Sequence, residues 1–224
     1  MSYKPLALLL SIWMLTCALG GQTREVAGTR QFRYGILVGP GVCPIDESNR
    51  EGVNNWISQL CFLMGGFASK PLNSWLNAQA EIQLVNRRAF RIFPHPQPYV
   101  YDMKVDIDAK LLRLPVSLII ASHTDHNVRT AYMGAGLALG APLHVTMTKE
   151  LRYQTQNETI KQNIWDSYSI PVIGYQAMLG IEKGQAFSEL RFGRDLTSFK
   201  APGLDVNWLQ QWEIWLLLGF RLRE

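Results

Sequence analysis

Hydrophobic and polar side chains alternate one by one over several long stretches of this 224-residue chain. Between Leu76 and Leu84 every even position is apolar, and every odd position is Asn, Gln or Glu. The same period of two recurs at 32–39, 131–140, 173–182, 189–192 and 211–223. Such alternation indicates β-strands whose two faces meet different surroundings.

Eight strands are predicted, at 32–43, 56–68, 75–86, 104–121, 129–144, 168–182, 186–197 and 208–222. Short turns are expected at 69–74, 122–127 and 183–185, and longer loops at 44–55, 87–103, 145–167 and 197–207. An even strand count with short turns on one side and long loops on the other is typical of outer-membrane barrels with periplasmic termini. The predicted fold is all-β: an eight-stranded antiparallel up-and-down transmembrane β-barrel.

A soluble lipocalin-like barrel or a β-sandwich would also alternate, so the content of the two faces has to separate these classes. The face opposite the apolar one carries glycines and a few ionisable groups, where a water-exposed face would be rich in Lys, Glu, Thr and Ser. Closure has a physical reason as well, because lipid offers no partner to an unpaired strand edge. We favour the barrel in lipid, with a soluble exported lipocalin-like binder as an alternative.

One of the predicted strands is less regular. In the stretch 104–121, Asp106, Asp108 and Lys110 are followed by leucines at even positions, which predicts a one-residue bulge near Leu111 or a loop in the first half.

Aromatic residues cluster near strand ends, as the girdles at the two membrane interfaces would require. The set is Trp56, Trp75, Trp165, Tyr168, Trp208, Trp212 and Phe220.

The first twenty residues predict a secretory signal peptide. They contain Lys4, an apolar run at 6–15 that is too short to span a bilayer, and a small-residue exit ending at Gly20. The barrel domain is then expected over 21–224. Because an exported chain meets an oxidising compartment, Cys43 and Cys61 can form a disulfide; the alternative is two free thiols.

Charge narrows the choice of partners. The chain has 22 basic and 18 acidic residues, a net charge of +4, and no Lys/Arg-rich run of five or more. A nucleic-acid partner is therefore not expected. After the signal, the longest apolar candidate for a spanning helix, 111–121, is interrupted by Arg113 and Pro115.

The lumen of an eight-stranded barrel is only wide enough for side chains. The face assigned to it carries several ionisable groups, namely Glu81, Lys110, Arg113, Glu182, Glu189, Arg191, Glu213 and Arg221. Unpaired charges are costly in such a space. We therefore predict a charge network in which Glu189 and Arg191, which flank Leu190, pair with Glu81, Arg113 or Glu213.

Catalytic chemistry has little support. The His-Thr-Asp-His turn at 123–126 lacks further metal ligands at a recognisable spacing. Ser122, His123 and Asp125 are neighbours in one turn, where a nucleophile and its base rarely reach the required geometry. We predict no catalytic residue, metal or cofactor, and keep a lipid- or peptide-modifying barrel enzyme as the second hypothesis.

Five motifs in order carry a family resemblance: Phe32-Arg-Tyr-Gly-Ile-Leu-Val-Gly, Leu112-Arg-Leu-Pro-Val-Ser-Leu, Tyr132-Met-Gly-Ala-Gly-Leu-Ala-Leu-Gly, Gly180-Ile-Glu-Lys-Gly with Phe187-Ser-Glu-Leu-Arg-Phe-Gly-Arg-Asp-Leu, and Leu216-Leu-Leu-Gly-Phe-Arg-Leu. Together they resemble the PorT-like outer-membrane β-barrel family of Bacteroidetes-type bacteria. The chain departs from many such barrels by ending Leu222-Arg-Glu instead of in an aromatic residue, and its loop at 86–101 has no counterpart in the pattern.

The resemblance implies an eight-stranded barrel in the bacterial outer membrane, and the family's namesake takes part in type IX protein secretion. We expect a non-enzymatic integral protein that contacts outer-membrane lipid. Its long loops or periplasmic turns would contact envelope or secretion-system proteins.

Overall fold

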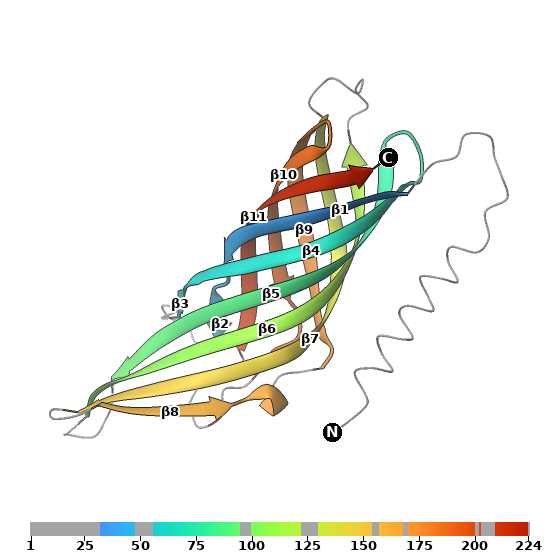
Figure 1. The fold of residues 1–224 in the computed structure, drawn as a ribbon. Coiled ribbons are helices and arrows are strands. Elements are labelled where there is room, and N and C mark those ends of the chain that lie inside the picture. Colours follow the sequence, from blue (N-terminus) through green and yellow to red (C-terminus); the bar gives the residue numbers. More distant parts are fainter. Residues whose placement is uncertain are drawn as a thin grey trace. The chain divides into compact units, whose positions relative to one another are not determined.

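Eight long strands form a closed antiparallel ring in the computed structural model (Figure 1). They are β1 (Arg33–Val42), β4 (Leu60–Pro71), β5 (Leu76–Pro94), β6 (Val100–Ala121), β7 (Thr130–Tyr153), β9 (Val172–Lys183), β10 (Ala186–Asp195) and β11 (Leu209–Arg223). Each pairs with the next along the chain, and β1 pairs with β11 to close the ring. The predicted eight-stranded up-and-down barrel is confirmed.

The structure describes residues 32–47, 56–94, 100–121, 130–153, 157–167, 170–199, 202 and 209–223. The predicted signal peptide at 1–20 and the turn at 122–127 lie outside these residues.

Three shorter strands lie at the long-loop end. β2 (Ile45–Glu47) pairs with β11, β3 (Ile57–Ser58) pairs with β5, and β8 (Asn157–Asn163) pairs with the far part of β7. A 3-10 turn, η1 (Trp165–Ser167), follows β8. Figure 1 shows β5, β6 and β7 running on past the other strands toward β8. Much of the loops predicted at 87–103 and 145–167 is therefore strand, which corrects the prediction. The reason is that the apolar and polar faces of these strands exchange places beyond the ring.

Within the ring the apolar face points outward. Along β6, Val116, Leu118 and Ile120 are 61%, 53% and 48% exposed, while Ser117 between them is 2% exposed. The other strands repeat the pattern, with exposed Ile36, Met64, Ile82, Leu137, Leu179, Leu190 and Leu216. A soluble lipocalin-like barrel would bury these side chains, so that alternative is wrong. The outward apolar surface, here called the belt, fits contact with lipid tails.

Beyond the ring the same strands exchange the polarity of their faces. Val105, Ile107 and Ala109 of β6 are buried inside, and Asp106 and Asp108 point outward. An apolar core forms here from Ile45, Trp56, Ala89, Val105, Ile107, Ala109, Leu111, Val145, Met147, Ile164, Val172, Phe199 and Leu209. We call this part the extension: residues 88–94, 100–111, 142–153 and 157–163. An apolar inside with a charged outside is the arrangement of a β-protein in water, so the extension lies outside the bilayer.

The predicted bulge lies on a different strand. Lys110 pairs with His144 and Leu111 with Pro142, which leaves Leu143 of β7 as the extra residue. β6 itself keeps its phase from Val105 to Ala121. The apparent phase slip arises because the outward face of β6 meets water at Asp106 and Asp108 and lipid from Leu112 onward. Lys110, which was expected in the lumen, is exposed on this outward face.

The aromatic girdle is only partly present. Trp75 and Phe220 are 50% and 45% exposed near the short-turn end, and Trp212 is half-buried. Trp56 belongs to the core of the extension, and Trp165 packs against it, so both assignments to the girdle were wrong. The remaining two, Tyr168 and Trp208, lie outside the described residues.

Candidate functional site

Ionisable side chains meet inside the ring where the lumen faces of β5 and β10 approach each other. Arg191 of β10 is 1% exposed and lies between the carboxylates of Glu81 and Glu189. Its Nη1 and Nη2 donate to Glu81 Oε2 and Oε1 at 2.9 and 3.1 Å, and its Nε donates to Glu189 Oε1 at 2.7 Å. These three residues form the Arg191 cluster.

Neutral donors complete the hydrogen bonding of both acids. Gln79 Nε2 and Gln83 Nε2 donate to Glu81 at 3.0 and 2.6 Å, and the Tyr132 hydroxyl donates to Glu189 Oε2 at 3.1 Å. A buried ion pair offsets the cost of losing water only when its remaining lone pairs are also satisfied. The lumen side chains of β5 and β7 provide that here.

Arg113 and Glu213 form a separate ion pair, with each other instead of with the Arg191 cluster. Arg87 joins them: its Nη2 donates to Glu213 Oε2 at 2.9 Å, and its Nη1 donates to Asp195 Oδ2 at 2.5 Å and to Gln211 Oε1 at 2.8 Å. We call these five residues the Arg87 cluster. Two arginines and two carboxylates make its formal charge zero.

Sequence reasoning missed Arg87, Asp195 and Gln211. Arg87 was assigned to a loop because the outward face of β5 turns polar just beyond Leu84. Its signal was nevertheless present, since the inward odd positions of 76–84 continue through Val85 to Arg87. Following only the inward, odd-numbered positions of this strand past Leu84 would have placed Arg87 in the lumen.

Glycines make room for bulky side chains in the lumen. A Cβ on Gly219 would overlap the ring of Phe187, and one on Gly180 would overlap the ring of Tyr132. Trp215 is fully buried in the lumen beside Gly41. Charged clusters and aromatic rings thus fill the narrow interior expected of eight strands.

Cys43 and Cys61 are both buried and belong to the same apolar cluster. Both are free thiols in this structure. The Arg88 amide donates to Cys61 Sγ at 3.2 Å. The disulfide between the two cysteines stays a prediction.

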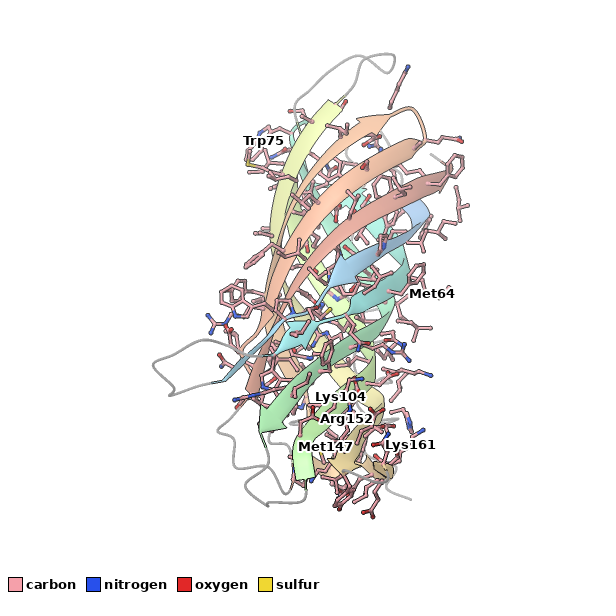
Figure 2. All side chains as sticks on the ribbon, turned by 90° about the vertical axis from the view of Figure 1, so that its left-hand side faces the viewer. Met64, Trp75, Lys104, Met147, Arg152 and Lys161 are labelled. Atoms are coloured by element: carbon pink, nitrogen blue, oxygen red, sulfur yellow. The ribbon has the colours of Figure 1, made fainter. Side chains whose placement is uncertain are left out.

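The outward face of the extension is strongly charged. Figure 2 shows Lys104, Arg152 and Lys161 together at the end of the barrel opposite Trp75. A hydrogen bond with Asp106 raises the pKa of Lys104, which keeps this amine protonated. Three ion pairs link side chains of this face: Arg88–Asp108 at 2.8 Å, Lys104–Asp106 at 2.9 Å and Arg152–Asp102 at 3.6 Å.

A groove of about 410 Å³ opens beside Arg88, Asp106, Asp108 and Lys161 of this face. Its lining includes Gln59, Arg88, Asp106, Asp108, Lys110, His144, Thr146, Thr148 and Lys161. We call it the outward groove. It is lined by residues of β5, β6, β7 and β8. Sequence reasoning had placed Arg88, Thr148 and Lys161 in loops and Lys110 in the lumen.

The remaining chemical candidates are less informative. Ser122, His123 and Asp125 lie outside the described residues. In the part of the chain that is described, no three His, Cys, Asp or Glu side chains gather as a metal site requires. Nor does any helix within that part have the length and apolar character to cross a bilayer.

The sequence matches no protein-family profile and no curated protein. Several solved structures resemble the fold. Ail of Yersinia pestis is 11% identical, with 86% of this chain and 99% of that chain covered and a TM-score of 0.42. Neisserial surface protein A is 12% identical, with 84% and 97% covered and a TM-score of 0.40. OprG of Pseudomonas aeruginosa is 12% identical, with 89% and 100% covered and a TM-score of 0.48.

The structure itself defines the class of protein. A closed, even-numbered ring leaves no strand edge for lipid to solvate, and the belt presents apolar side chains around it. The charged face begins only where β5, β6 and β7 leave the ring. Single-chain barrels of this kind belong to the bacterial outer membrane. The chain is an integral outer-membrane β-barrel protein.

Proposed function

We propose that this protein is a non-enzymatic, non-conducting barrel that presents an interaction surface to other envelope proteins. The observation that carries the proposal is the extension, whose inward apolar side chains form a core together with residues at the long-loop end of the ring. A barrel that served only as an anchor would need no folded platform outside the bilayer. All seven residues of β8 at its edge are exposed.

The lumen supports the non-conducting and non-enzymatic parts of the proposal. Its four buried acids, Glu81, Glu189, Asp195 and Glu213, each bind an arginine. A general base needs a carboxylate that can reach a substrate proton, and these carboxylates are enclosed and occupied. A planar bilayer containing the purified protein should therefore show no stepwise conductance.

The resemblance to the PorT-like family supplies the finer part of the proposal. On that basis we propose that the partners belong to an envelope assembly and that type IX protein secretion is the process served. Short periplasmic turns and the extension are the two surfaces outside the membrane through which such partners could be contacted.

A hairpin replacement tests this role. Replacing residues 149–160 with Asn-Gly connects Thr148 to its register partner Lys161 through a two-residue turn and removes most of the β7–β8 hairpin. In host cells lacking the natural copy, the wild-type gene should restore secretion of type IX cargo, and the shortened gene should not. Heat-shifted gel mobility of the shortened protein checks that the barrel still folds.

Two results would separate the parts of the proposal. Normal cargo secretion in cells without the protein refutes the type IX role and leaves the barrel standing. Full activity of a folded barrel with the short hairpin refutes the role of the extension.

A further inference from the structure

The outward groove lies directly next to the belt. Lys110 and Leu112 are two residues apart on the same face of β6, and Leu112 lies on an apolar surface with Ile82 and Leu84. Lys110 is exposed at the first polar position beyond this surface. Headgroups occupy the layer immediately outside the hydrocarbon core of a bilayer. The groove therefore opens at the level of the headgroups.

Three adjacent strands set its width. Asp106 of β6 pairs with Thr148 of β7, which pairs with Lys161 of β8. Residues directly opposite each other on one sheet face have Cβ atoms about 5 Å apart, so the groove spans about 10 Å from Asp106 to Lys161. That width admits one sugar ring with its substituents.

Two lysines that line the groove take no part in the ion pairs of this face. Asp108 is held by Arg88 and Asp106 by Lys104. Lys110 and Lys161 have no ion-pair partner among the described residues, although both line the groove. The groove consequently carries a local excess of positive charge on two flexible amines.

Acceptor capacity is also left over. Arg88 uses Oδ2 of Asp108, while Oδ1 accepts no hydrogen bond from any described residue and the side chain stays 30% exposed on the groove. The Thr148 hydroxyl lies on the groove wall nearby. Amines bind phosphate oxygens, and carboxylates and hydroxyls bind sugar hydroxyls. A simple anion would have no use for the acidic part of the groove.

We propose that the outward groove binds the phosphorylated sugar headgroup of an outer-leaflet glycolipid. Lys110 and Lys161 hold phosphate oxygens, and Asp108 and Thr148 bind sugar hydroxyls. The position beside Leu112 favours a lipid over a free sugar phosphate, because the acyl chains of the same molecule can then lie on the belt. The inference rests on the membrane assignment and on the predicted barrel orientation, in which termini and short turns are periplasmic, so that the long-loop end with the extension faces the cell exterior.

Binding to nanodiscs tests the proposal. The full mature protein is placed in phosphatidylcholine nanodiscs, and its retention of lipid A, a bisphosphorylated glucosamine disaccharide lipid, is measured by native mass spectrometry. The variant Lys110→Gln/Lys161→Gln should bind lipid A at least about tenfold more weakly, because it lacks both charge-assisted hydrogen bonds to the phosphate oxygens. Lys183→Gln, at the exposed end of β9 on the opposite rim, is the matched control and should bind as the wild type does.

Further arms distinguish the sources of the ligand. Phosphatidylglycerol, which has a phosphate and no sugar, should bind more weakly than lipid A; equal binding overturns the sugar assignment. Free glucosamine 6-phosphate should compete poorly; competition at the concentration of the lipid overturns the choice of a lipid. Unchanged lipid A binding by the double variant overturns the site altogether.

Failure of the membrane assignment looks different. In that case the wild-type protein would remain soluble after carbonate treatment and show no heat-shifted mobility, and both the assignment and this inference would fall. A double variant with normal mobility and normal lipid A binding refutes only the groove.

Discussion

Replacing Arg191 with Met tests how the lumen is held together. Met keeps most of the length and volume of the side chain, so packing changes little. The substitution removes four hydrogen bonds, two to Glu81 and one each to Glu189 and Gln176. It also leaves two buried carboxylates facing each other without a cation.

The expected cost follows from burial. Glu81 and Glu189 are 5% and 2% exposed, so water cannot replace the lost guanidinium. Breaking a buried pair by removing one partner typically costs about 3–5 kcal/mol. The free energy of unfolding of Arg191→Met should fall by about that amount, as measured by urea titration of tryptophan fluorescence in phospholipid vesicles.

Two further variants separate the effect of burial from the loss of an arginine side chain as such. Arg88→Met removes an arginine of comparable geometry whose side chain is 52% exposed, so the loss of its ion pair with Asp108 should cost at most about 1 kcal/mol. Replacing the whole cluster, as Arg191→Met with Glu81→Gln and Glu189→Gln, removes the unpaired charges and should recover most of the lost stability. The reasoning is refuted if Arg191→Met is as stable as the wild type, or if the triple variant is less stable than the single one.

Three more substitutions probe the rest of the barrel. Val116→Arg places a charge in the belt and should lower the free energy of unfolding in vesicles by about 2–4 kcal/mol; a neutral effect would contradict lipid contact at this position. Gly39→Ala should lower the yield of heat-shifted, folded protein because its Cβ would overlap a backbone carbonyl of β11, whereas Gly66→Ala, with its nearest atom at 3.6 Å, should fold normally; equal yields would argue against close approach at the closing seam. Tyr132→Phe removes the hydrogen bond to Glu189 and should cost about 1 kcal/mol in the same urea titration, and a loss above that range would point to a packing role for the hydroxyl.

The period of two was readable because it is a local property of the pleated backbone. Alternation at 76–84, 189–192 and 211–223 predicted strands there and the facing of Glu81, Arg191 and Glu213, and the eight predicted strands together gave the even count that a closed ring requires. The polar face, rich in glycine and sparse in charge, pointed to a filled lumen and hence to lipid outside. These inferences needed no knowledge of which strands pair.

Whether the outward face of a strand contacts lipid or water at a given height along the barrel was decided by the tertiary structure alone. Along 104–121 the side chains alternate between inward and outward without interruption, yet Asp106 faces water and Leu118 faces lipid because they lie at different heights on the same outward face. A local pattern carries no information on height, so strand was mistaken for loop and Lys110 was assigned to the lumen. The partners in the lumen were equally inaccessible, since Arg191 and Glu81 are 110 residues apart in the chain and meet only after the ring closes.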